Sequence, residues 1–180
     1  NYLVLGLLAE RVTGATLEDQ LAERIFQPLK LRRTSFDPAT PSLRVHGYRL
    51  GMHDGIVSGA PEDTQGESAA WAWSAGAIVS DAGDLARFFG ALVSGQVVPK
   101  TLLGEMIPAE GYGLGLAAFT TSCGTAIGHT GNLGGYVSVV WTTANADRIV
   151  VLMGNSYPLT PEADAAIHRT LDDAFCGATD

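Results

Sequence analysis

Residues 125–154 read TAIGHTGNLGGYVSVVWTTANADRIVVLMG, and this stretch carries the period-two alternation that is typical of β-strands. It predicts strands over 125–129, 136–142 and 148–154, and Asn145-Ala146-Asp147 forms the turn of a hairpin between the last two. Tyr112 to Leu116 predicts one more strand upstream. We therefore expect an antiparallel sheet in this part of the chain.

Helical patterns surround these strands. We expect helices over 2–13, 16–27, 80–93 and about 99–107, and a last one beginning with Thr160 as N-cap and Pro161 at its first position. The helix over 2–13 is apolar nearly all round, which predicts that it is buried. Residues 30–70 are expected to be mostly irregular, with room for a short strand at 46–50. Helices first, then an antiparallel sheet, then a helix covering one face define an α+β fold.

Composition excludes several classes of function. The chain has 180 residues, 11 Lys and Arg, 19 Asp and Glu, and a formal net charge of −8, so a nucleic-acid partner is not expected. With four His and two Cys, a structural zinc site of the ribbon kind cannot be built. The longest apolar run, near residues 3–9, is far shorter than the roughly 20 residues that span a bilayer.

The glycine-rich stretch from Gly128 to Tyr136 has two readings. It is either a plain connection between two strands, with His129 as a surface or capping residue, or an edge strand whose backbone N–H groups face a substrate. In the second reading His129 and Thr130 hydrogen-bond the substrate, and the glycines allow it to approach closely.

Two further features also leave alternatives open. Cys123 and Cys176 are either two unrelated buried thiols or a disulfide that ties the last helix to the sheet. Trp71 is either a core residue or part of a binding surface. The nucleophile motifs of serine hydrolases are absent from these 180 residues, which contain no Gly-x-Ser-x-Gly, no Ser-x-x-Lys and no Tyr-x-Asn.

Several segments, taken in order, resemble the serine β-lactamase and D-Ala-D-Ala carboxypeptidase family, in the branch of class C β-lactamases and related esterases. The segments that carry this resemblance are Asn1 to Gly6, Glu23-Arg24-Ile25-Phe26-Gln27-Pro28-Leu29, Trp71 to Ser80, Tyr112-Gly113-Leu114-Gly115 and Gly128-His129-Thr130-Gly131. Within the family, Ser122-Cys123-Gly124 and Ala174-Phe175-Cys176-Gly177 are similar to the secreted actinobacterial D-Ala-D-Ala carboxypeptidase.

The resemblance implies a role for each residue of the His-Thr-Gly motif. His129 would supply positive or hydrogen-bonding character near the proton relay, and Thr130 would contact the substrate's carboxylate or leaving group. Gly131 completes the motif, and the backbone N–H of Asn132 would belong to the oxyanion hole. Trp71 would form a wall of the substrate cleft. The reaction would use no metal or cofactor.

The resemblance also implies a disulfide between Cys123 and Cys176, and an extracellular or secreted protein. Residues 1–70 would be the end of the helical lobe and a long loop, and residues 71–180 the C-terminal part of the α/β lobe. The chain would begin just after the family's catalytic tyrosine, so the helix over 2–13 would pack against protein outside these residues. We therefore expect no acyl-transfer activity from the 180 residues alone.

The chain departs from the carboxypeptidase pattern at two places. Ala117 stands where that enzyme has an arginine for the substrate's carboxylate, and Asn132 replaces a threonine after the motif. Substrates therefore range over D-Ala-D-Ala peptides, β-lactams, esters and amides, and an esterase or D-aminopeptidase relative is one alternative. A non-catalytic binding or regulatory module of the same fold is another, and an unrelated α+β binding domain is a third. The sequence does not fix the oligomeric state.

Overall fold

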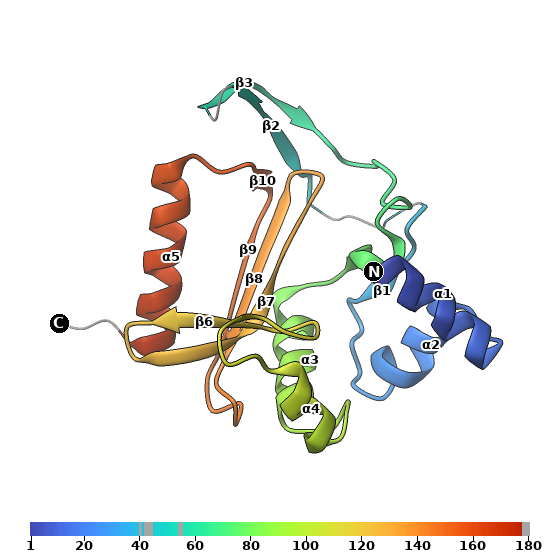
Figure 1. The fold of residues 1–180 in the computed structure, drawn as a ribbon. Coiled ribbons are helices and arrows are strands. Elements are labelled where there is room, and N and C mark those ends of the chain that lie inside the picture. The colour runs from blue at the N-terminus through green and yellow to red at the C-terminus, as the bar shows by residue number, and fades with distance from the viewer. Residues whose placement is uncertain (40, 42–44, 54–55, 178–180) are drawn as a thin grey trace.

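The structure is a computed structural model of the chain and describes residues 1–39, 41, 45–53 and 56–177. Its centre is a five-stranded antiparallel sheet in the order β5-β6-β7-β8-β9 (Figure 1). The strands are β5 (Gly111–Tyr112), β6 (Ala117–Thr121), β7 (Gly124–Leu133), β8 (Tyr136–Thr142) and β9 (Ile149–Gly154). The predicted hairpin is confirmed, since β8 and β9 pair from Thr142 opposite Ile149 to Val137 opposite Gly154.

Helices cover both faces of this sheet, whereas only one covered face was expected (Figure 1). One face packs on α3 (Ala82–Val93) and α4 (Lys100–Met106), and the other on α5 (Pro161–Cys176). Successive strand residues point to opposite faces, so neighbours in one strand enter different cores. The first core contains Phe89, Leu92, Leu103, Leu116, Ile127 and Val140. The second contains Ala126, Val139, Trp141, Leu171 and Phe175.

Side-chain caps fix the starts of three helices as the sequence predicts. Asp81 Oδ1 accepts the N–H of Asp84 at 2.9 Å at the start of α3, and Thr160 Oγ1 accepts the N–H of Ala163 at 3.2 Å at the start of α5. Thr16 Oγ1 accepts the N–H of Asp19 at 3.1 Å. The Asp19 carboxylate accepts from the Thr16 hydroxyl, so this pair closes through side chains.

The first two helices differ from the prediction. The helix α1 (Tyr2–Thr13) has the predicted bounds and ends at Gly14, whose φ is 72°. The described residues bury Gly6 alone in this helix and leave Val4 65% exposed, so they do not cover its apolar side chains. That the helix is buried against protein outside these residues stays a prediction. The next helix begins as α2 (Leu17–Leu21) but widens into a π-helical turn, η1 (Ala22–Phe26), before Pro28.

Residues 30–70 contain more regular structure than expected. The strands β2 (Tyr48–His53) and β3 (Ile56–Asp63) form an antiparallel hairpin, and β10 (Ser156–Tyr157) adds to β2 in parallel. A two-stranded pair joins β1 (Ser35–Phe36) to β4 (Ile78–Val79), and a short 3₁₀ turn, η2 (Trp73–Ala75), precedes β4. The glycines and Pro61 hide the strand alternation in the sequence, and the register of the hairpin shifts after Arg49.

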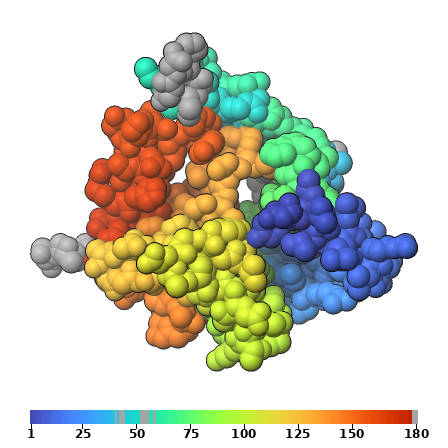
Figure 2. Space-filling view, viewed as in Figure 1, coloured from blue at the N-terminus to red at the C-terminus, as the bar shows by residue number. Residues whose placement is uncertain are grey.

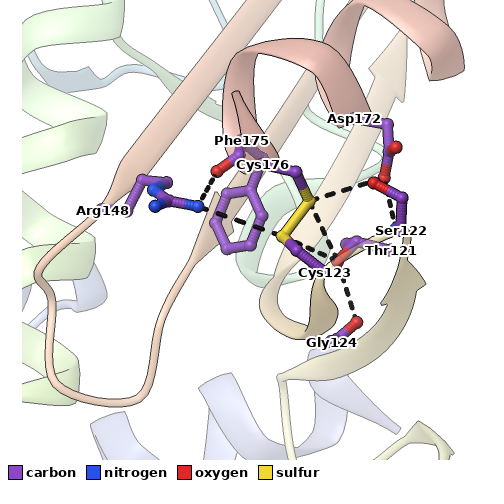
Figure 3. The surroundings of a disulfide bond; sticks show 8 residues. All are labelled: Thr121, Ser122, Cys123, Gly124, Arg148, Asp172, Phe175 and Cys176. Atoms are coloured by element: carbon purple, nitrogen blue, oxygen red, sulfur yellow. Dashed lines mark hydrogen bonds between the residues drawn. A yellow bond between two sulfur atoms is a disulfide. The ribbon is translucent and has the colours of Figure 1, made fainter. Parts of the chain in front are cut away.

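A disulfide joins Cys123, between β6 and β7, to Cys176 at the end of α5 (Figure 3). Asp172 Oδ1 accepts the N–H of Ser122 at 2.8 Å beside it. Arg148 donates to the Phe175 carbonyl, and its guanidinium carbon lies 5.6 Å from the centre of the Phe175 ring. The disulfide and these polar contacts anchor the last turn of α5 to the sheet.

Candidate active site

The strand β7 is paired on both sides in its first half and on one side in its second half. Pairing with β6 ends where Ala117 faces Gly128, whereas pairing with β8 continues as far as Leu133 opposite Tyr136. Of the two interpretations of the His-Thr-Gly motif, the plain connection between two strands is therefore ruled out, and the edge strand agrees with the register. From His129 to Leu133 the motif lies in β7 itself, with β8 as its only strand partner among the described residues.

The register shows which backbone groups face this open edge. Two-residue turns close both hairpins, at 122–123 and at 134–135, and the residues flanking such turns exchange backbone hydrogen bonds. By alternation along β7, His129 and Gly131 bond to β8, and Thr130 and Asn132 turn their N–H and C=O groups to the open side. Gly131 lies against Ser138, whose Oγ would be 2.8 Å from an added Cβ.

The side chain of His129 lies on the opposite face of β7 from Thr130 and Asn132. Its Nε2 is 3.0 Å from the hydroxyl of Tyr112 in β5, and the two rings meet edge to face at 5.5 Å. Tyr112 is in turn 3.0 Å from the hydroxyl of Tyr2, the first residue of α1. Although Tyr112 is 54% exposed, the partial burial of its hydroxyl, followed by the hydrogen bond to Tyr2, raises the pKa of Tyr112 to about 12, so the hydroxyl keeps its proton at neutral pH.

Thr130 and Asn132 line a hollow of about 200 Å³ between the sheet and α5, which we call the α5 hollow. Most of its lining is apolar, and the described part of the chain contributes no Lys or Arg to it. Trp141 forms part of this lining; it is 4% exposed, and its Nε1 has no hydrogen-bond partner within residues 1–39, 41, 45–53 and 56–177. The other lining residues are Phe119, Gly131, Val137, Val139, Tyr157, Leu159, Asp164, Ile167 and His168.

A second hollow of about 270 Å³, which we call the hairpin hollow, lies beside the β7–β8 turn. Trp71, 73% exposed, lines it, and Asn132 and Tyr157 line both hollows. The α5 hollow is the one visible in Figure 2, where the surface is hollowed between the α5 segment (red) and the end of the central strands (orange). The rest of the lining consists of Arg49, Leu50, Leu133, Gly134, Gly135 and Pro158.

Among the described residues, Arg49 is the one Lys or Arg in the lining of either hollow, and it is already paired. Its guanidinium donates to Glu62 at 3.0 Å and to Glu67 at 2.8 Å. Two carboxylates therefore offset its single charge. A substrate carboxylate bound here would therefore meet no unpaired Lys or Arg from the residues that the structure describes in either lining.

Of the residues that the sequence analysis assigned to the site, Thr130, Gly131 and Asn132 line the α5 hollow, and Trp71 lines the hairpin hollow together with Asn132. His129 lies in the same strand, but its side chain contacts Tyr112 on the opposite face and lines neither hollow. Their roles in a reaction stay predictions. It places Cys123 and Cys176 at the far end of β7, away from both linings. Tyr2, Arg49 and Tyr157 were missed because they lie far from the motif in sequence. Tyr112 was quoted as part of a strand motif without a role of its own. Within the described residues, no three His, Cys, Asp or Glu side chains cluster as a metal site would require, and no helix is long and apolar enough to cross a membrane.

The helices on both faces of an antiparallel sheet, with a His-Thr-Gly strand at its open edge, define a β-lactamase/transpeptidase-like fold. The chain belongs to the Beta-lactamase family, whose sequence profile matches residues 1–175.

Solved structures similar to this chain include two amide hydrolases. A D-stereospecific amidohydrolase from Streptomyces sp. is 27% identical, with a TM-score of 0.85, and the match covers 99% of this chain and 54% of that one. The D-amino acid amidase from Ochrobactrum anthropi SV3, complexed with L-phenylalanine amide, is 23% identical with a TM-score of 0.76, over 94% and 54% of the two chains.

A third similar structure, the octameric penicillin-binding protein homologue from Pyrococcus abyssi, is 24% identical with a TM-score of 0.68, over 94% and 41% of the chains. At these identities the amidase from Ochrobactrum and the Pyrococcus protein support the fold alone. The present chain spans about half the length of the three solved structures.

Proposed function

We propose that these residues form the His-Thr-Gly side of the active site of a serine hydrolase that works through an acyl-enzyme. The observation that carries the proposal is the open edge of β7, where the backbone of Asn132 faces outward between two hollows. A backbone N–H at such an edge can stabilise the oxyanion of a tetrahedral intermediate. One donor of this kind lowers the barrier by about 3 kcal/mol.

In the proposed reaction, a serine hydroxyl attacks the carbonyl carbon of the substrate and loses its proton to a base. The carbonyl oxygen becomes an oxyanion beside the N–H of Asn132, and the leaving group departs with a proton. Water then hydrolyses the ester. Since the 180 residues contain no Ser-x-x-Lys, we propose that the serine and its base lie outside them, and that these residues alone do not acylate.

The side chains near the edge have separate proposed roles. Thr130 would hold the substrate at the entrance of the α5 hollow. Because Gly131 has no side chain, β7 can lie close to Ser138 beside this entrance. His129 would provide hydrogen bonding near the proton relay from the opposite face. Trp71 would form a wall for the part of the substrate that enters the hairpin hollow.

The charges favour a substrate without a carboxylate at the scissile end, such as a D-amino acid amide. Arg49 is neutralised by Glu62 and Glu67, and Ala117 offers no cation on the neighbouring strand. The likeness to the Streptomyces amidohydrolase supports the same class. The D-Ala-D-Ala carboxypeptidase reading would need a cation that the described residues of the two linings do not supply. β-Lactams and esters remain alternative acyl donors, because they use the same acylation chemistry.

The disulfide supports the further proposal of an extracellular or secreted protein, because such bonds persist in oxidising compartments. The proposed partners are small amide, ester, peptide or β-lactam substrates.

The test uses the protein expressed from its complete reading frame. We expect hydrolysis of D-phenylalanine amide with a kcat/KM at least about tenfold above that for the L-amide and for a D-Ala-D-Ala peptide. A tenfold ratio corresponds to a difference of about 1.4 kcal/mol in activation free energy. The isolated 180 residues are the control and should not be labelled covalently by a fluorescent penicillin. A complete protein that binds these compounds but turns none of them over would favour the non-catalytic module.

A further inference from the structure

We infer that Tyr112 is a positioning residue for His129, and that Tyr2 acts on His129 only through Tyr112. This inference rests on the proposed function, because it assigns a role within the same site. The hydroxyls of Tyr2 and Tyr112 are 3.0 Å apart, and the Tyr112 hydroxyl is 3.0 Å from His129 Nε2. His129 Nδ1 lies within hydrogen-bond distance of the Thr130 carbonyl oxygen.

The chemistry of these groups fixes the direction of each hydrogen bond when the imidazole is neutral. A carbonyl oxygen can only accept, so Nδ1 of His129 carries the proton and donates it to Thr130. Nε2 is then the acceptor, which obliges Tyr112 to donate its hydroxyl proton. The Tyr112 oxygen is left to accept from Tyr2. The Nδ1–H tautomer of His129 therefore satisfies all three hydrogen bonds, from His129 to Thr130, from Tyr112 to His129 and from Tyr2 to Tyr112.

The same series of hydrogen-bonded groups, His129, Tyr112 and Tyr2, also accommodates the protonated imidazole. Nε2–H then donates to the Tyr112 oxygen, and the Tyr112 hydroxyl turns to donate to Tyr2. The ring of His129 keeps its place beside Thr130 in both protonation states, because only hydroxyl protons have to move. Without Tyr2, the Tyr112 hydroxyl would have no acceptor for its proton when the imidazole of His129 is protonated.

The backbone holds Tyr112 in position for this role. Tyr112 pairs with Ala117 at the end of β5, and the Gly113 N–H donates to the Leu116 carbonyl at 2.8 Å. An added Cβ on Gly113 would lie 2.3 Å from the Met106 carbonyl oxygen, so the turn after Tyr112 packs closely on the end of α4.

The test combines tautomer and kinetics in the protein expressed from its complete reading frame. Nitrogen-15 NMR of the neutral His129 ring should show the Nδ1–H tautomer in the unmodified protein and in Tyr2→Phe, and a mixture with Nε2–H in Tyr112→Phe. Tyr112→Phe should lower kcat about tenfold, with KM changed less than about twofold, as the loss of one hydrogen bond predicts. Tyr2→Phe should lower kcat about threefold.

The double variant separates positioning from two independent roles. If Tyr2 acts only through Tyr112, the double Phe variant matches Tyr112→Phe instead of multiplying the two effects. Tyr48→Phe is the matched control, because the Tyr48 hydroxyl makes no hydrogen bond among the described residues and should alter neither readout.

An Nε2–H tautomer in the unmodified protein, an unchanged tautomer in Tyr112→Phe, an unchanged kcat in that variant, or multiplicative effects would each overturn the inference. An unmodified protein without any hydrolase activity would instead overturn the proposed function. The tautomer of His129 would even then test whether Tyr112 donates its hydroxyl proton to His129.

Discussion

Gly128 lies so close to β8 that a Cβ added to it would be 1.7 Å from the carbonyl oxygen of Val140. This contact occurs at the residue where pairing with β6 ends and the open edge of β7 begins. A side chain at this position cannot be accommodated unless the backbone of one strand moves. The position of the open edge relative to β8 therefore depends on the absence of a side chain at Gly128.

Gly128→Ala should displace the motif strand. We expect a loss of about 3 kcal/mol in unfolding free energy, in the range of overpacked cores, and at least a hundredfold loss of kcat/KM. Gly104→Ala in α4 is the control, because an added Cβ there meets nothing within 4 Å, and a helical Gly→Ala change is mildly stabilising. Chemical denaturation and amide hydrolysis measure both effects, and an active, stable Gly128→Ala protein would contradict the close contact.

Trp71→Ala tests the wall of the hairpin hollow. Because Trp71 is 73% exposed, its removal should leave the melting temperature within about 1 °C, while KM rises about tenfold through lost substrate contact. Leu102→Ala, at a residue 50% exposed on α4, serves as the control and should change neither quantity. A large fall in melting temperature would show instead that Trp71 supports the fold.

The double variant Glu62→Gln/Glu67→Gln should release Arg49 from its two partners. We expect the ratio of kcat/KM for a substrate ending in a carboxylate, relative to the corresponding amide, to rise by no more than about fivefold, because solvent screens an exposed ion pair. Glu23→Gln/Glu105→Gln, at two exposed glutamates, is the matched control because it also removes two negative charges. If the ratio does not change, Arg49 has no part in choosing the substrate.

Removing the disulfide tests its contribution to stability. The double variant Cys123→Ala/Cys176→Ala opens a loop with a sequence separation of 53, so the unfolding free energy should fall by about 4 kcal/mol. The unmodified protein, prepared under oxidising conditions, should gain the mass of two hydrogens on reduction. Two free thiols in that preparation would contradict the proposal of an extracellular protein.

Asp84 should make part of the stability depend on pH. It is 4% exposed, and although burial raises its pKa, hydrogen bonds from the Arg33 backbone, Thr34 and Arg87 outweigh this effect and lower the pKa overall. A depressed folded-state pKa stabilises the protein above the unfolded value of about 3.9, and this stability is lost as pH falls through the folded pKa. Asp84→Asn should lower the unfolding free energy at pH 7 by about 2 kcal/mol and flatten its decline in acid. An equally steep acid decline in the variant would assign the effect to other carboxylates.

Local signals in the sequence predicted much of the sheet and its helices. Thr160 and Pro161 fixed the start of α5, and Asn145-Ala146-Asp147 fixed the β8–β9 turn, because these features depend on neighbouring residues alone. The residues His129 to Asn132 were also identified as site candidates, but whether they lie in a strand or in a plain connection was left open, since glycine weakens the strand pattern.

Features that depend on distant residues were not predictable. Tyr2 and Tyr112 are 110 positions apart, and nothing near either residue indicates the other. The β2–β3 hairpin was missed because its alternation is interrupted and its pairing is completed by Ser156 and Tyr157, about 100 positions downstream. Arg49, by the same reasoning, could not be assigned its two carboxylate partners.

The parallel pairing of β10 with β2 has a consequence for altering substrate choice. Tyr157 belongs to that pair, and with Asn132 it forms a common boundary of the two hollows. A substitution at either residue that enlarges one hollow also resizes the other. For the substrate of the proposed function, selectivity for its two ends would therefore be coupled at these residues, and variants meant to change one end alone would begin from positions that line a single hollow, such as Ile167 or Leu50.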